Sequence, residues 1–172
     1  DALKETGLLD KVSKVEAVEI ETPEAQKVSG RYKDTPKVKV INQDFFDFYK
    51  ETLGTKTYDL ILGNPPYIRY QYLKESQREC QAQILTSHGM KSNKLINAWV
   101  AFMVASVQML SKRGKIAFVI PAEILQVAYA EDLRLYLANH LAKITLITFE
   151  QLVFPDIEQE VVVFIGEKGE AE

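Results

Sequence analysis

The ten residues Tyr58-Asp59-Leu60-Ile61-Leu62-Gly63-Asn64-Pro65-Pro66-Tyr67 contain the clearest structural signal in the chain. The first five are mostly apolar, which is typical of a buried strand. The strand must end near Gly63, because each proline lacks the amide hydrogen that a sheet requires and restricts the residue before it. The segment therefore predicts a strand that runs directly into a stiff turn, and this turn carries an asparagine and a tyrosine.

Strands and helices alternate on both sides of this segment, which predicts an α/β fold with a largely parallel sheet. Besides residues 58–62, strands are expected at residues 15–20, 38–41, 115–120, 144–149 and 160–165. One helix is expected to begin at Thr22, with a hydroxyl cap and a proline in its first turn. Two more are expected at residues 96–110 and 130–141.

Two local features complete this prediction. Gly114 follows the expected helix 96–110 and is typical of a residue just beyond a helix C-terminus. Residues 71–94 are polar and lack a sustained apolar period, which predicts a long loop with a helical turn around residues 73–85. Cys80 is then expected to be a loop thiol without a function.

Composition limits the class of protein. With 172 residues, 47% hydrophobic and 26% charged, the chain has the size and composition of one soluble globular domain. No apolar run approaches the roughly 20 residues that cross a bilayer, so no membrane partner is expected. The single cysteine excludes an internal disulfide and a cysteine-based metal site, and no metal is expected. The chain therefore fits a reducing cytoplasm. The net charge of −3 argues against nucleic acid as a partner, unless the DNA-reading part lies elsewhere.

The turn Asn64-Pro65-Pro66-Tyr67 has the chemistry to activate an exocyclic amine on an aromatic ring. Such an amine is a poor nucleophile because its lone pair is delocalised into the ring. Acceptors aimed at both N–H bonds favour a pyramidal nitrogen, and the Asn64 side-chain oxygen and the Pro65 carbonyl can be those acceptors. Tyr67 then offers a flat face to the base. The alternative is a plain rigid turn with an exposed tyrosine.

This turn resembles motif IV of amino-methyltransferases, and the chain from about residue 15 to 166 is similar to the gamma-class N6-adenine DNA methyltransferases. The matching segments, in the family's order, are Asn42-Gln43-Asp44-Phe45-Phe46, Asn64-Pro65-Pro66-Tyr67, Asn97-Ala98-Trp99-Val100-Ala101-Phe102, the strand and following loop from Gly114 to Leu125, and the last hairpin, Val153-Phe154-Pro155 followed by Val161-Val162-Val163-Phe164. The resemblance implies a Rossmann-like sheet with an antiparallel last strand, S-adenosylmethionine as cofactor, and double-stranded DNA with a flipped adenine as substrate.

The resemblance also implies roles for particular residues. Asn64 and Pro65 would hold the adenine amine, Pro66 would stiffen the turn, and Tyr67 and Phe154 would sandwich the base. Asn64 would also border the cofactor. Asp44 would receive the cofactor's adenine, although it serves equally well as a helix cap.

Three further assignments have simple alternatives. Glu19, which would bind the cofactor ribose, lies in an acidic stretch with Glu16 and Glu21. Phe154 would also suit core packing. Five basic residues could contact DNA phosphates or could simply be solvated: Arg69, Lys74, Arg78, Lys91 and Lys94. His88 and His140 have no partner pattern and receive no role.

One departure from the family concerns the glycine-rich segment expected at its first strand, because only Gly7 precedes Glu19. Residues 1–172 are therefore expected to form part of a methyltransferase catalytic domain, truncated on its N-terminal side, inactive alone and without a target-recognition domain. The family's sheet order is 3-2-1-4-5-7-6, so the block 4-5-7-6 should survive. The open edge of strand 58–62 should be covered by residues 15–20, or by another molecule in a strand-exchanged dimer, and we favour the first.

Three other functions compete with this interpretation. A glutamine methyltransferase that acts on release factors shares the Asn-Pro-Pro-Tyr turn, because a side-chain amide presents the same lone-pair problem. A cytosine N4-methyltransferase usually has serine at the position of Asn64. A catalytically inactive binding or assembly module is the third alternative.

Overall fold

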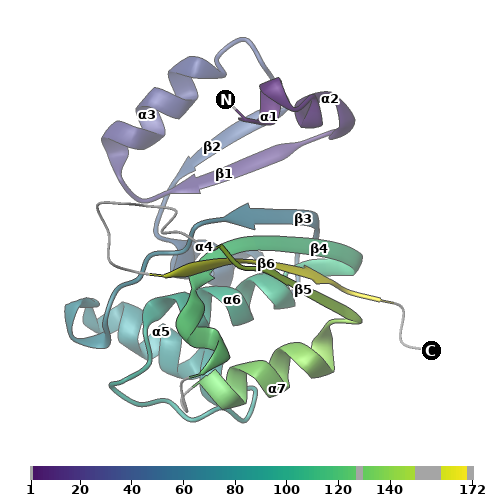
Figure 1. Cartoon of the computed structure of the whole chain (residues 1–172). Helices are drawn as coiled ribbons and strands as arrows, with labels where there is room; N and C mark the ends of the chain where they lie inside the picture. Colours follow the sequence, from purple (N-terminus) through teal and green to yellow (C-terminus); the bar gives the residue numbers. More distant parts are fainter. Residues whose placement is uncertain (1, 127–129, 150–159, 170–172) are drawn as a thin grey trace. The chain divides into compact units, whose positions relative to one another are not determined.

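The computed structural model describes residues 2–126, 130–149 and 160–169 (Figure 1). The chain divides into two compact units, Asp1–Glu51 and Thr52–Glu172, and each is described by itself. Within the described ranges, no helix combines the length and apolar character that a membrane span requires.

The first unit is a βαβ element with two short helices before it. Its two strands are parallel and paired in register from Val15 with Val38 to Glu19 with Asn42. Both strands therefore end at the same edge. The elements are α1 (Ala2–Glu5), α2 (Leu8–Lys11), β1 (Val15–Glu19), α3 (Thr22–Arg31), β2 (Val38–Asn42) and α4 (Phe45–Thr52), the last of which leads into the second unit.

Helix α3 begins at Thr22 with Pro23 in its first turn, as predicted. The expected hydroxyl cap is wrong, because the N-cap residue is Glu21 and makes no side-chain cap bond. Thr22 lies one residue inside the helix, and its hydroxyl instead donates to the Asn42 side-chain oxygen, 2.9 Å away. This bond ties the start of α3 to the end of β2.

The second unit contains a four-stranded sheet in the order β3-β4-β6-β5. β3 and β4 are parallel, and β6 is antiparallel to both β4 and β5. This order confirms the predicted block 4-5-7-6 and the antiparallel last strand. The elements are β3 (Tyr58–Gly63), η1 (Tyr70–Tyr72), α5 (Glu75–Thr86), α6 (Ala98–Gln108), β4 (Leu110–Pro121), η2 (Ala122–Leu125), α7 (Glu131–His140), β5 (Lys143–Ile147) and β6 (Val161–Glu167).

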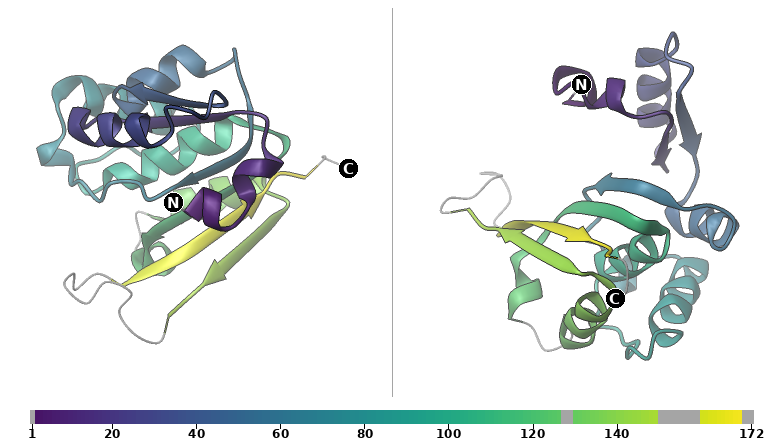
Figure 2. Two further views of the ribbon diagram at one scale, coloured as in Figure 1. Left: turned by 90° about the horizontal axis from the view of Figure 1, so that it is seen from above. Right: turned by 90° about the vertical axis from the view of Figure 1, so that its right-hand side faces the viewer.

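The core of this unit lies between the sheet and the helices α5, α6 and α7, which cover one face of the sheet (Figures 1 and 2). Nine of the eleven residues of α6 are buried, including Trp99 and Met103 with no exposed surface. A helix that is apolar on all sides is typical of a core position. Alternate residues of β4, namely Ile116, Phe118 and Ile120, are buried as well, as expected for one face of a strand.

Residues 75–86 form a three-turn helix, at the place where a helical turn was expected, but the prediction of a long loop across residues 71–94 is wrong. The helix begins after Lys74, whose backbone N–H donates to the side-chain oxygen of Gln77 at 2.9 Å. Its apolar side consists of Cys80, Ile84 and Leu85, each at most 3% exposed. Cys80 is therefore a buried core thiol and not a loop residue.

Gly114 does not end a helix. Helix α6 ends at Gln108, and Gly114 lies inside β4. The reason for glycine is steric, because a Cβ atom there would lie 2.8 Å from the Tyr58 carbonyl oxygen. The close approach occurs where the β3–β4 register shifts between Tyr58 and Leu60.

The pairing that we favour between residues 15–20 and strand 58–62 would join the two units, and it stays a prediction. β1 pairs with β2, and the α3 crossover brings these two strands together with little loss of chain entropy. Among the described strands of the second unit, β3 has only β4 as a partner. Leu60 and Leu62 of β3 are 37% and 51% exposed.

Candidate active site

The Asn64–Pro–Pro–Tyr67 turn lies where β3 ends, and residues 64–69 have no regular structure. Asn64 is exposed, Pro65 is buried, and Pro66 and Tyr67 are half-buried. Gly63 precedes the turn, and a Cβ atom at this position would lie 3.0 Å from the ring of Phe118. The turn therefore lies at the carboxyl end of two parallel strands, which is where ligands bind in α/β sheets.

Tyr67 is held by its hydroxyl group. The hydroxyl donates a hydrogen bond of 3.0 Å to the backbone carbonyl of Val119, in the neighbouring strand β4. Burial raises the pKa of Tyr67 to about 12, so the hydroxyl stays protonated and remains a donor at neutral pH. The bond therefore anchors the ring at the end that lies farthest from the Tyr67 backbone, and the residue is half-buried.

The chain that leaves the turn is tied to two helices. The carbonyl of Ile68 accepts a hydrogen bond of 2.9 Å from the backbone N–H of Ala98, in the first turn of α6. The guanidinium of Arg78, in α5, donates to the carbonyls of Tyr70 and Gln71 at 3.1 and 2.8 Å. These contacts connect the turn to the packed helices of the unit.

Two polar residues near these contacts had no role in the sequence prediction. Asn97 is the N-cap of α6 without a side-chain cap bond, and its side-chain oxygen is buried without a hydrogen-bond partner in the described part of the chain. Glu123 follows β4 and accepts a bond of 3.3 Å from the Trp99 indole N–H. Both residues lie in segments that resemble the family, residues 97–102 and 114–125, but the resemblance gave neither of them a role.

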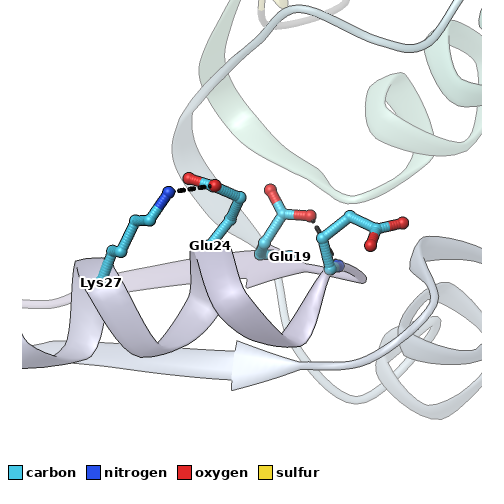
Figure 3. A network of polar contacts seen from close by, with 4 residues as sticks. Glu19, Glu24 and Lys27 are labelled. Carbon is cyan, nitrogen blue, oxygen red and sulfur yellow. Dashed lines mark hydrogen bonds and ion pairs between the residues drawn. The ribbon is translucent and has the colours of Figure 1, made fainter.

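In the first unit, Glu19 and Asp44 lie at the carboxyl ends of β1 and β2. Oε1 of Glu19 accepts a bond of 2.8 Å from the backbone N–H of Glu21 (Figure 3). Lys27 is paired with Glu24, so it does not neutralise Glu19. Oδ1 of Asp44 accepts a bond of 2.8 Å from the backbone N–H of Phe46, which is the helix-cap role.

The five basic candidates differ in their surroundings. Arg69, Lys74, Lys91 and Lys94 are exposed. Arg78 is half-buried, and its donors point to backbone carbonyls. Phe154 lies outside the described residues, as does Pro155. His88 and His140, which received no role, lie in one aromatic cluster with Tyr136.

The fold and the polar turn define the class of protein. A class I S-adenosylmethionine-dependent methyltransferase from Listeria monocytogenes has a similar structure, with a TM-score of 0.75, 13% identity, and coverage of 99% of this chain and 49% of that one. The methyltransferase subunit of a type I restriction-modification system from Streptococcus thermophilus has a TM-score of 0.69 and 20% identity, and the match covers 88% of this chain and 33% of that one. DrdV in its DNA complex has a TM-score of 0.55 and 16% identity, and the match covers 66% of this chain and 14% of that one. The chain therefore has the α/β methyltransferase fold.

The family is defined by sequence. Residues 7–154 match the Eco57I restriction-modification methylase family, and the chain belongs to this family. It is 32% identical over 131 residues to the type II methyltransferase M.HincII of Haemophilus influenzae, covering 76% of this chain and 25% of that protein. It is 28% identical over 144 residues to M.AccI of Acinetobacter calcoaceticus, and this match covers 83% of this chain and 26% of that protein. The chain thus spans about a quarter of the length of these relatives. The predicted resemblance to restriction–modification methyltransferases is confirmed.

Proposed function

We propose that the full-length protein is an S-adenosylmethionine-dependent DNA methyltransferase that acts on N6 of adenine. The observation that supports this proposal is the position of the Asn64–Pro–Pro–Tyr67 turn at the carboxyl end of β3, in a chain that belongs to a restriction-modification methylase family. Relatives of this chain are named as type II methyltransferases, and DrdV, a similar structure, binds DNA.

In this proposal the turn binds the adenine amine. The Asn64 side chain is exposed and available to accept one N–H bond, and the Pro65 carbonyl accepts the other. Tyr67, held by its bond to Val119, provides a fixed surface for the flipped base. Phe154 is proposed to cover the opposite face. The turn is stiffened by Pro65 and Pro66, so little reorganisation is needed when the amine becomes pyramidal.

Glu19 and Asp44 fit the expected cofactor. Only one carboxylate oxygen of Glu19 has a hydrogen-bond partner among the described residues, so the second can accept from a ribose hydroxyl. Asp44 lies at the end of the adjacent strand, where its carboxylate can accept from an adenine amine while it caps α4. Asn64 borders the same cofactor in the proposal. S-adenosylmethionine supplies the methyl group on an activated sulfonium.

The DNA backbone is proposed to contact the four exposed basic residues that follow the turn: Arg69, Lys74, Lys91 and Lys94. Their positions on loops and at a helix start suit phosphate contacts, which position DNA without reading its sequence. Lys91 lies on an anchored loop, because its backbone N–H donates to the Asp132 carboxylate at 3.1 Å. The open edge of β3 is proposed to pair with a strand of a second copy when the 172-residue chain is alone.

The test is a product analysis with the full-length protein. The enzyme is incubated with labelled S-adenosylmethionine and either DNA or a translation release factor, and the methylated nucleosides and amino acids are identified by mass spectrometry. We expect N6-methyladenine, loss of this product in Asn64→Ala, and wild-type turnover in the control Asn139→Ala, which changes an exposed asparagine of α7. N4-methylcytosine or methylglutamine as the product would contradict the proposal, and so would the absence of any methylated product.

A further inference from the structure

Arg78 makes three contacts with one short segment. Its Nε–H donates to the carbonyl of Tyr70 at 3.1 Å, and an Nη–H donates to the carbonyl of Gln71 at 2.8 Å. The guanidinium carbon also lies 5.2 Å from the centroid of the Tyr70 ring. Both carbonyls belong to η1, so the side chain holds this helical turn through two bonds and a ring contact.

The segment that Arg78 holds continues directly from the proposed catalytic turn. Only Ile68 and Arg69 separate Tyr67 from Tyr70. The other attachments of this stretch are the Tyr67 hydroxyl to Val119 and the Ile68 carbonyl to Ala98. The first ties it to β4 and the second to α6. Arg78 ties it to α5, which packs against α6.

The Arg78 contacts use the features that distinguish arginine from lysine. The planar guanidinium can donate two bonds in fixed directions and stack on a ring at the same time, whereas an ammonium group is a point charge. The Tyr70 carbonyl also accepts the backbone N–H of Leu73 at 3.2 Å, so Arg78 adds a second bond to an acceptor that already closes the turn. An arginine that serves only as a phosphate contact needs neither the two carbonyls nor the ring.

We propose that Arg78 is a positioning residue that holds the exit of the Asn64–Pro–Pro–Tyr67 turn, and that it is not a DNA-phosphate contact. This inference rests on the proposed function. Arg78 fixes η1 relative to α5, and η1 in turn limits the movement of Ile68 and Tyr67. The base-binding turn is therefore rigid before DNA arrives, which lowers the barrier to methyl transfer more than it strengthens binding.

The first experiment compares Arg78→Lys with Arg69→Ala in the full-length protein. Turnover is measured with DNA, and DNA affinity is measured across a salt series. We expect Arg78→Lys to lower kcat by about tenfold to a hundredfold, with the DNA Kd and its salt slope unchanged. Arg69→Ala, at a proposed phosphate contact, should instead weaken DNA binding and reduce the salt slope by about 1. A reduced salt slope with unchanged kcat in Arg78→Lys would overturn the proposal.

The second experiment does not depend on methylation. Hydrogen exchange of the Ala98 amide reports on the bond to Ile68. We expect this amide to exchange at least several-fold faster in Arg78→Lys, while the amides of β4 and β6 exchange at wild-type rates. Tyr70→Leu removes the ring contact but leaves both carbonyl bonds, and it should give a smaller change of the same kind. If neither variant alters Ala98 exchange, the positioning role is wrong even if the protein methylates DNA. If the wild-type protein fails to methylate DNA while Ala98 exchange responds, the proposed function fails and the structural role of Arg78 stands.

Discussion

The hydroxyl of Tyr67 lies 3.0 Å from the carbonyl oxygen of Val119 and donates a hydrogen bond to it. The two residues are separated by 52 positions in the sequence: Tyr67 lies in the turn after β3, and Val119 lies near the end of the adjacent strand β4. The bond connects the proposed base-stacking ring to β4, so the ring is oriented by the sheet and not only by the turn. Its hydroxyl and its ring face thus have separate functions.

This separation predicts different effects for two substitutions of Tyr67 in the full-length protein. Tyr67→Ala removes the stacking surface and should weaken retention of the flipped base by about 1–3 kcal/mol, if values for single strands apply. Tyr67→Phe keeps the ring and loses only the bond to Val119, so its effect on base retention should be smaller. The measurement is the fluorescence of 2-aminopurine at the target position. Equal losses in both variants would contradict the stacking role.

The same hydroxyl predicts a change of stability at alkaline pH. The pKa of Tyr67 is raised from 10.0 to about 12 by burial, so the folded state retains this proton more strongly than the unfolded state. The stabilising contribution is complete below pH 10 and is lost as pH rises from 10 towards 12. Urea midpoints measured across this range should fall more steeply for the wild type than for Tyr67→Phe. Parallel curves for the two proteins would show that Tyr67 titrates normally.

Much of the second unit could be predicted from sequence because its signals are local. Proline residues end β3 and β4 directly after apolar runs, so the positions of both strand ends and of the Asn64 turn follow from backbone chemistry. The order of the strands came from the resemblance to a family, since no local pattern in one sequence specifies which strands pair.

The errors involve interactions that have no local pattern. The full length of helix α5 was not predicted, because glutamine, serine and charged residues surround its few apolar positions. These positions are recognised only from the burial of Ile84 and Leu85 in the structure. The steric need for Gly114 comes from Tyr58, which is distant in sequence. The contacts of Arg78 with carbonyls seven and eight residues earlier depend on how η1 packs against α5.

Gly114 predicts a clear loss of stability on substitution. A Cβ atom would lie 2.8 Å from the Tyr58 carbonyl oxygen and 3.0 Å from Leu110 and Ser111 atoms, and the carbonyl belongs to backbone that cannot move aside easily. Gly114→Ala should therefore lower the free energy of unfolding by about 1–3 kcal/mol. Chemical denaturation measures this loss. Gly30→Ala is the control, because a Cβ atom at Gly30 would extend into open space and alanine favours the helix.

The ion pairs of Glu167 predict that the stability of the folded protein depends on pH and on salt. Its carboxylate accepts a hydrogen bond from the Lys115 ammonium at 3.1 Å and lies 3.7 Å from the Lys143 ammonium. These two ion pairs join three strands at one end of the sheet. The hydrogen bond and charge of Lys115 lower the pKa of Glu167. Because the pKa of Glu167 is lower in the folded state, its contribution to stability is present above the pKa of the unfolded state. This contribution is lost as pH falls through the pKa of the folded state. Glu167→Gln should therefore lower the thermal midpoint at neutral pH but not in strong acid, and salt should reduce the difference. Glu79→Gln, at an exposed position in the middle of α5, is the control and should leave the thermal midpoint unchanged at both pH values.

The open edge of β3 predicts that the isolated 172-residue chain associates with itself. Unpaired backbone groups along an edge strand can pair with another chain, and exposed apolar side chains favour this contact. Leu62 is 51% exposed on this edge, so Leu62→Lys should reduce association by placing a charge there, with little effect on folding. Sedimentation velocity over a range of protein concentrations measures the outcome.

Leu135→Lys is the matched control for this last prediction. Leu135 is 58% exposed on α7, so the substitution adds the same charge at a similarly exposed leucine outside β3. Association should persist in Leu135→Lys and decrease in Leu62→Lys, because only the second substitution changes the strand edge. Equal effects of both variants would mean that net charge, and not β3 pairing, controls association. A wild-type chain that stays monomeric at every concentration would mean that the edge of β3 is protected without a partner.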